Sequence, residues 1–153
     1  MQINTMLGAL FAATASGAAI ESKKAITYDV QGFSAGCIPH SVECSYGFQV
    51  VPSTAAPGSS GTTCGSLVSG PDFLPPVALT ACADPKIAYA VAIANGGLTL
   101  TITSAVDKHT NATGTYTAPA SEFTIYNGGS TQSQIYVGPT DFTIDAVNVK
   151  SCQ

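Results

Sequence analysis

The chain has 153 residues, of which five are Lys, none is Arg and nine are Asp or Glu, so charged residues make up only 9%, against about a quarter in an average soluble domain. Hydrophobic residues make up 45%, which is enough for the core of one domain at this length. The net charge is −4 and there is no basic cluster. This argues against binding of nucleic acid or of an anionic membrane surface, because both depend on Lys and Arg.

The N-terminus has the pattern of a secretory signal peptide. Residues 6–15 read MLGALFAATA, an apolar run of ten, whereas a membrane span needs about 20. Small residues follow and suit cleavage after Ala18 or Ala19, although Met1–Thr5 lack a basic residue. A buried N-terminal helix is the alternative. We expect residues 1–18 to be a signal peptide and residues 19–153 to form one secreted, soluble domain without membrane insertion.

The remainder of the chain alternates between apolar and polar residues with a period of two, which is typical of half-buried β-strands. The apolar positions of this pattern are Ile26, Tyr28, Val30; Cys44, Tyr46, Phe48, Val50; Ile87, Tyr89, Val91, Ile93; Leu98, Leu100, Ile102; Phe123, Ile125; Ile135, Val137; and Phe142, Ile144, Ala146. Val147 and Val149 have the opposite parity, which predicts a bulge near Ala146. The Ala-rich segment 87–94 also permits a helix, but β-branched residues at alternate positions favour a strand.

Turn signals separate these strands. Asn95-Gly96 is typical of a type I′ hairpin, and Asn127-Gly128-Gly129 marks a second break. Residues 52–61 (PSTAAPGSSG) and 70–76 (GPDFLPP) are predicted loops. About eight or nine short strands with turns at this spacing predict a single antiparallel β-sandwich or β-barrel.

Five cysteines lie beyond the predicted signal peptide, at positions 37, 44, 64, 82 and 152. Secretion makes disulfides the expected state, and the odd number leaves one thiol unpaired or paired to another molecule. Two bridges among five cysteines allow 15 connectivities. A zinc site is disfavoured because no C-x-x-C occurs and neither His40 nor His109 has ligand spacing from a cysteine pair. A catalytic Cys–His pair would need a reduced thiol.

No catalytic motif emerges from the acidic residues or the two histidines. Glycoside hydrolysis needs two convergent carboxylates, but most of the acids adjoin turns, where they usually cap loops. His40 lies in the segment CIPHS and is expected to be a loop residue, and neither histidine accompanies a G-x-S-x-G turn. No nucleotide motif is present, so no cofactor is expected.

The aromatic residues and one glycosylation motif bear on surface contacts. Trp is absent, and four of the six tyrosines lie in apolar strands, which leaves Tyr116 and Tyr126 as the candidate surface contacts. Asn111-Ala112-Thr113 is a sequon in a polar stretch, so Asn111 is a candidate N-glycosylation site.

The segment Gly32–Ser41 (GFSAGCIPHS), followed by residues 44–50 (CSYGFQV), resembles a pattern in small secreted proteins of filamentous fungi. The later Cys64, residues 74–77 (LPPV), Cys82 and residues 98–101 (LTLT) continue it, so the resemblance covers about Ile26 to Phe142. The proteins that carry this pattern are the hypersensitive response-inducing proteins, which act as elicitors or effectors at the plant apoplast without assigned catalysis. The resemblance implies the same role for this chain. Cys152 has no counterpart in their four-cysteine pattern.

Loop spacing predicts the disulfides Cys37–Cys44, which would close a hairpin mouth, and Cys64–Cys82, which would span the Pro-rich stretch. A hairpin turning within residues 52–61 sets Cys64 opposite about Gln49, too far from Cys44 for a bridge. Cys152 is expected to be free, since chain ends fray.

From these observations we expect a secreted elicitor that is recognised by an unknown plant surface component and that acts as a monomer without catalysis. A cell-wall or carbohydrate-binding module is the alternative, which clustered exposed aromatics would favour. A small hydrolase is the third hypothesis. If recognition rather than turnover is the activity, single removal of His40, His109 or one loop acid should leave elicitation near wild type, because recognition spreads over many contacts.

Overall fold

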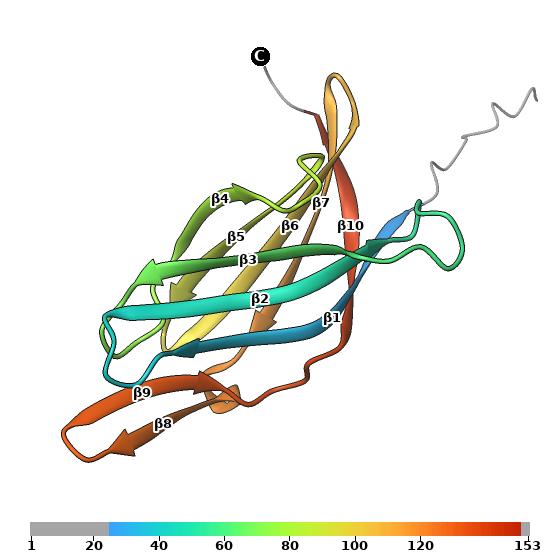
Figure 1. Cartoon of the computed structure of the whole chain (residues 1–153). Helices are drawn as coiled ribbons and strands as arrows, with labels where there is room; N and C mark the ends of the chain where they lie inside the picture. The colour runs from blue at the N-terminus through green and yellow to red at the C-terminus, as the bar shows by residue number, and fades with distance from the viewer. Residues whose placement is uncertain (1–24, 151–153) are drawn as a thin grey trace, which may run out of the picture.

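The computed structural model describes residues 25–150, which form ten β-strands and one short 3-10 helix (Figure 1). The elements are β1 (Ile26–Cys37), β2 (Glu43–Pro52), β3 (Thr62–Ser69), β4 (Val77–Ala81), β5 (Ile87–Ala94), β6 (Gly97–Asp107), β7 (Thr110–Ala118), η1 (Ala120–Glu122), β8 (Phe123–Gly128), β9 (Thr131–Tyr136) and β10 (Phe142–Lys150). The all-β prediction is confirmed, and the segment 87–94 is a strand.

Eight of the strands form a nearly closed antiparallel barrel in the order β3-β2-β1-β10-β7-β6-β5-β4 (Figure 1). The last strand, β10, lies between β1 and β7 and so ties the C-terminal part of the chain into the middle of the sheet. The hairpin β8–β9 projects from this barrel and pairs with β1 only at Gly36 and Ile135. The architecture is therefore a barrel rather than a sandwich, with one additional hairpin.

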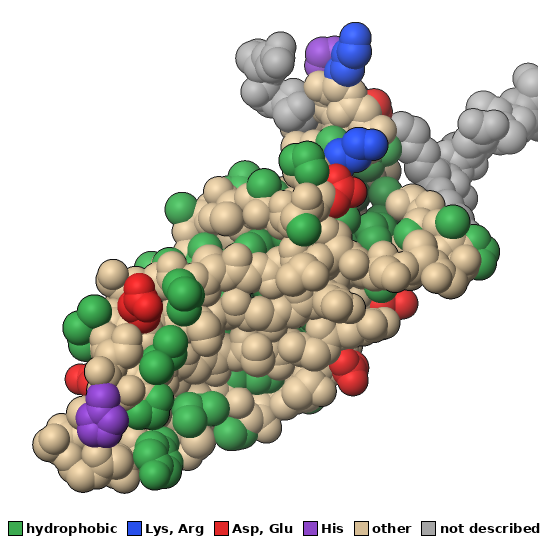
Figure 2. All heavy atoms as spheres, viewed as in Figure 1, with side chains coloured by type: hydrophobic (Ala, Val, Ile, Leu, Met, Phe, Trp, Pro, Cys, Tyr) green, Lys and Arg blue, Asp and Glu red, His purple; other side chains and the backbone are tan. Residues whose placement is uncertain are grey.

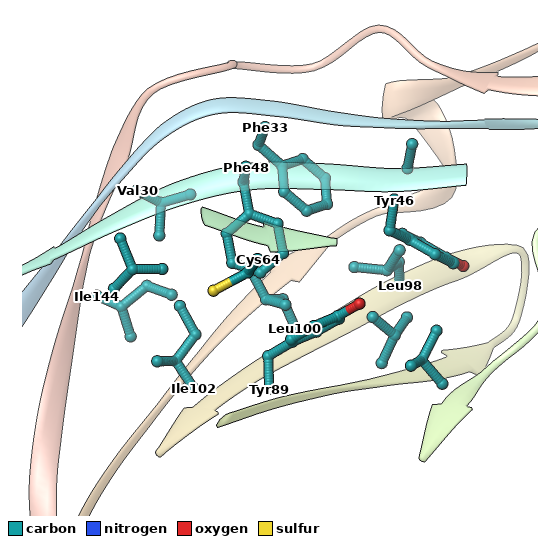
Figure 3. Packing of buried hydrophobic residues seen from close by; sticks show 14 of the residues in the cluster. Val30, Phe33, Tyr46, Phe48, Cys64, Tyr89, Leu98, Leu100, Ile102 and Ile144 are labelled. Carbon is teal, nitrogen blue, oxygen red and sulfur yellow. The ribbon is translucent and has the colours of Figure 1, made fainter. Parts of the chain in front are cut away.

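The core fills the barrel because the alternating residues point inward, as expected (Figure 3). Tyr28, Tyr89, Leu100 and Ile102 have no exposed side-chain surface. Phe48 packs edge-on against Tyr89 with ring centroids 5.1 Å apart. Burial of large apolar side chains contributes about 1.5–3 kcal/mol each, so these inward rows are the main source of stability.

The turn signals take the predicted form. Asn95 and Gly96 both have positive φ, 53° and 76°, as a type I′ turn requires. β8 continues through Asn127 and Gly128, and Gly129 with φ of 70° turns the chain into β9. Residues 53–61 and 70–76 lie outside the strands, which confirms both loops.

The predicted bulge near Ala146 is wrong. β10 pairs in continuous register with β1 up to Ala146 and with β7 from Ala146 to Lys150. Val147 and Val149 are exposed because β1 begins at Ile26, opposite Ala146, so the end of β10 extends beyond the barrel. The β-branched side chains there suit a strand without belonging to a core.

A bulge lies instead in β1, where the register with β2 shifts between Gln31 and Ser34. Gly32 has a φ of +62°, which a residue without Cβ adopts readily. Its N–H donates to Asp141 Oδ1 at 2.8 Å, and the N–H of Phe33 donates to Thr140 O at 2.7 Å. The second half of β1 therefore leaves β10 and runs toward β9.

Both predicted disulfides, Cys37–Cys44 and Cys64–Cys82, are present. Cys37 and Cys44 are direct register partners. Cys64 lies opposite Phe48, one residue from the expected position. Cys152, the signal peptide and its cleavage site lie outside the described residues and stay predictions.

Candidate functional site

Residues 37–41, which belong to the segment that carries the family resemblance, lie at one end of the barrel. Beyond the bulge, β1 reaches Cys37, and the chain turns through residues 38–42 into β2. The N–H of Ile38 donates to Glu43 O at 2.9 Å and closes this turn. His40 is an exposed turn residue with a φ of 60°, which is uncommon for a residue with a Cβ. The Cys37–Cys44 disulfide fixes the base of the turn.

The loop 70–76 packs beside this turn and connects it to the β8–β9 hairpin. The N–H of Gly70 donates to Val42 O at 2.9 Å. Gln134 of β9 holds the loop twice, because its N–H donates to Asp72 O and its Oε1 accepts from the N–H of Leu74, both at 2.9 Å. Three segments that are distant in sequence thus form one surface.

We call this surface the Cys37 end and define it by the turn 38–42, the loop 70–76 and β9. It exposes three large apolar side chains, Ile38, Val42 and Phe73, which are 40%, 68% and 56% exposed. Hydrophobic side chains gather at this end in the space-filling view (lower left in Figure 2). Exposed apolar side chains that occur together mark interaction surfaces in soluble proteins.

A groove of about 420 Å³ runs along the Cys37 end between β1 and β9. Ala35, Cys37 and Ile38 lie on the β1 side, and Ile135 and Tyr136 lie on the β9 side. The groove forms because the bulge turns β1 away from β10 while β9 pairs with β1 at a single position. Its lining is mostly apolar, so it suits an apolar contact rather than a charged ligand.

A cluster of two tyrosines and one glutamate adjoins the groove at Tyr136, and no sequence pattern predicts it. The hydroxyl oxygens of Tyr116 and Tyr136 each lie 3.3 Å from Glu122 Oε2, to which Tyr116 donates, and they are 3.4 Å from each other. Tyr136 also lies 2.8 Å from Pro139 O, to which its hydroxyl can donate. Burial, with further contributions from Tyr116 and Glu122, raises the pKa of Tyr136. The phenol therefore stays protonated and holds the segment after β9.

The tyrosines are distributed largely as the sequence predicts. Tyr28, Tyr46, Tyr89 and Tyr136 are buried, and Tyr126 is exposed. Tyr116 is half-buried, because its ring stacks on Phe142 with centroids 3.8 Å apart. Phe73 and Tyr126, the two exposed aromatics among the described residues, come from separate elements.

Two of the acidic residues cap turns, as expected. Asp84 Oδ1 accepts from the N–H of Lys86 at 3.0 Å, and Asp107 Oδ1 accepts from the N–H of His109 at 2.8 Å. His109 lies in the β6–β7 turn, at the other end of the barrel from the turn that holds His40 (Figure 1). Within residues 25–150 no group of three His, Cys, Asp or Glu side chains could hold a metal ion. No helix in this part of the chain could cross a bilayer.

Asn111 lies at the start of β7, in register with Val149 and Ala105. The next residue, Ala112, is fully buried, so Asn111 and Thr113 face outward. The sequon is therefore on the outer face of the sheet, and its glycosylation stays a prediction.

Comparisons with known proteins indicate the fold. No family model matches the chain, and no curated protein matches it in sequence. Two crystal structures of the allergen Alt a 1 from the fungus Alternaria alternata are similar, with TM-scores of 0.53 and 17% identity. The first match covers 82% of this chain and 96% of the allergen chain, and the second covers 80% and 88%. The chain thus shares its fold with a fungal allergen.

Proposed function

We propose that the protein is a secreted fungal elicitor that plant cells recognise through the Cys37 end, without a catalytic step. The observation that carries this proposal is the position of the residues that resemble the hypersensitive response-inducing proteins, including that of the rice blast fungus. Phe33 to Pro39 line the groove, and Ile38, Pro39 and His40 are exposed. Residues 38–40 of the motif are therefore available to a partner, whereas Phe33, Ala35 and Cys37 are buried.

The chemistry of the Cys37 end suits recognition of a partner surface. Exposed apolar side chains lie beside a groove whose lining is mostly apolar and includes the polar residues Ser34, Ser45 and Thr140. A mixture of apolar and polar groups is usual in protein interfaces. The Cys37–Cys44 disulfide and the hydrogen bonds of Gln134 hold the three segments together. A surface that is ordered before binding loses less conformational entropy in the complex.

The location that we propose is the plant apoplast. Two disulfides within the described residues are compatible with an oxidising, extracellular compartment. The fungal allergen is similar in fold. We infer the elicitor role from the motif and not from this allergen.

Infiltration of the purified mature protein into leaves tests the proposal. We expect local cell death with the native protein and none with protein that has been heat-denatured and reduced. His40→Ala and His109→Ala should retain activity near wild type, because neither belongs to an acid–base constellation. Loss of activity in folded His109→Ala, whose histidine lies away from the Cys37 end, would favour the hydrolase hypothesis, and an inactive native protein would refute the elicitor proposal.

A further inference from the structure

Asn111, the acceptor residue of the sequon, lies on β7 between β6 and β10, and these three strands run side by side (Figure 1). It is paired with Ala105 of β6 and with Val149 of β10, and Thr113 is paired with Val147. Residues that are paired across antiparallel strands point to the same face of the sheet, with Cβ atoms about 4.5–5.5 Å apart. Both valines therefore lie on the outer face, next to the sequon.

The two valines form an apolar strip that does not belong to the core. Val147 is 66% exposed and Val149 is 48% exposed, whereas Ile144, which points inward from the same strand, is 2% exposed. Exposed apolar side chains that lie together mark interaction surfaces. Asn111-Ala112-Thr113 is the only sequon of the chain, and a glycan on Asn111 begins directly beside the strip. The register of β7 and β10 thus identifies the group that can cover it.

The side chain of Asn111 is free to carry a glycan in the folded domain. Its amide makes no hydrogen bond to any residue within 25–150, and it faces outward because Ala112, the next residue, is fully buried. The hydroxyl oxygen of Thr113, the third residue of the sequon, lies 3.0 Å from that of Thr103 on the same face. Glycosylation of Asn111 therefore breaks no hydrogen bond that the fold uses.

We propose that Asn111 carries an N-linked glycan whose first sugar rings pack on Val149 and Val147. In the secretory pathway, Asn111 Nδ2 attacks C1 of the N-acetylglucosamine at the end of a lipid-pyrophosphate-linked oligosaccharide. The Nδ2–C1 bond forms, the C1–O bond to the pyrophosphate breaks, and Nδ2 loses one proton. The C–H groups on the face of a sugar ring are apolar, so they remove the valine side chains from water while the ring hydroxyls stay hydrated.

This assignment goes beyond the elicitor proposal, although it rests on the same secretion, because N-glycosylation belongs to secreted proteins. The strip lies at the end of the barrel where β1 begins, opposite Ala146, whereas the Cys37 end lies where β1 ends. A glycan on Asn111 therefore covers apolar surface at one end of the barrel and leaves the proposed recognition surface open at the other.

The mass of the secreted protein tests the modification. Residues 19–153 are expressed in a eukaryotic host behind a leader that this host already secretes, so that failure of the native signal peptide is not confused with failure of this proposal. We expect the wild-type protein to exceed its polypeptide mass by one N-glycan and Asn111→Gln to have the polypeptide mass. Secreted wild-type protein with an unmodified Asn111 would overturn the proposal.

Thermal unfolding tests the contact between the glycan and the valines. The glycosylated protein is compared with Asn111→Gln in two backgrounds, the natural one and one with Val147→Ala and Val149→Ala, which removes the methyl groups that the sugar would cover. We expect loss of the glycan to lower the Tm by at least about 3 °C in the natural background, and by less than half as much in the alanine background. Nuclear Overhauser effects should also connect the valine methyl groups to the first N-acetylglucosamine.

A glycan that extends into solvent gives different results. Equal losses of Tm in the two backgrounds, no loss in the natural background, or glycosylated protein without these Overhauser effects would each contradict packing of the sugar on β10.

Discussion

Cys64 in β3 and Cys82, the residue after β4, are bonded across the gap between the two edge strands of the barrel. The same register continues along the chain, because the N–H of Ala83 donates to Thr63 O and the N–H of Asp84 donates to Thr62 Oγ1, both at 2.8 Å. The disulfide therefore joins the two edges of the sheet, β3 and the end of β4, and both of its cysteines are buried.

Removal of this disulfide should destabilise the domain more than removal of the other one. We expect Cys64→Ser with Cys82→Ser to lower the free energy of unfolding by about 3 kcal/mol or more, since 18 positions separate the pair and it closes the barrel. Cys37→Ser with Cys44→Ser, which spans 7 positions, should cost about 2–3 kcal/mol. Urea unfolding of both double variants measures the difference, and the reverse order would contradict the role given to Cys64–Cys82.

A side chain at position 138 is predicted to lower the stability of the domain. A Cβ at this position would lie 2.5 Å from Tyr136 Oη and 2.6 Å from Glu122 Oε2, so Gly138→Ala should cost about 1–3 kcal/mol by overpacking. Gly36→Ala is the control, because its Cβ would meet its nearest neighbours at 3.8 Å. Thermal unfolding compares the two, and equal melting temperatures would disprove the close approach.

Stability should fall at alkaline pH. Burial raises the pKa of Tyr28, Tyr46 and Tyr136 above the usual value of 10.0. A pKa that is higher in the folded state gives stability that is complete below pH 10 and is lost as the pH rises above it, because the unfolded tyrosines ionise first. Tyr136→Phe should reduce this slope. Urea unfolding between about pH 8 and pH 11 measures it, and a flat profile would rule out the effect.

Processing is predicted at the end of the apolar N-terminal run. Protein recovered from a culture filtrate should begin at Ala19 or Ile20, since both starts leave small residues at the preceding positions. N-terminal sequencing decides this, and recovery of Met1 would refute the signal peptide.

Alternation predicts five of the eight barrel strands, β1, β2, β5, β6 and β10, because in these strands large apolar side chains occupy the inward positions. It does not identify β3, β4 and β7, which contain few large buried side chains. The turn at Asn95-Gly96 and both disulfides also follow from the sequence, since short loops restrict which residues can meet. The end of β10 is mispredicted for another reason. Val147 follows Ala146 without any local sign that β1 begins opposite Ala146, and only the pairing of strands distant in sequence reveals it.

The candidate site is less predictable for the same physical reason. The groove depends on the single pairing of Gly36 with Ile135, and the tyrosine–glutamate cluster unites Tyr116, Glu122 and Tyr136 from three segments. Alternation identifies Tyr136 as buried, but it does not say which polar group lies opposite the hydroxyl. The position of Asn111 beside Val149 is likewise a property of sheet topology.

The most direct test of recognition through the Cys37 end is a leaf infiltration dose series with two matched variants. Val42→Asp places a charge at this end, and Val147→Asp places the same charge at the other end; the two valines are 68% and 66% exposed. We expect Val42→Asp to raise the half-maximal dose for cell death at least about tenfold, as loss of a central contact would, and Val147→Asp to leave it unchanged. Equal activity of the two folded variants, or loss of activity in Val147→Asp alone, would contradict the account.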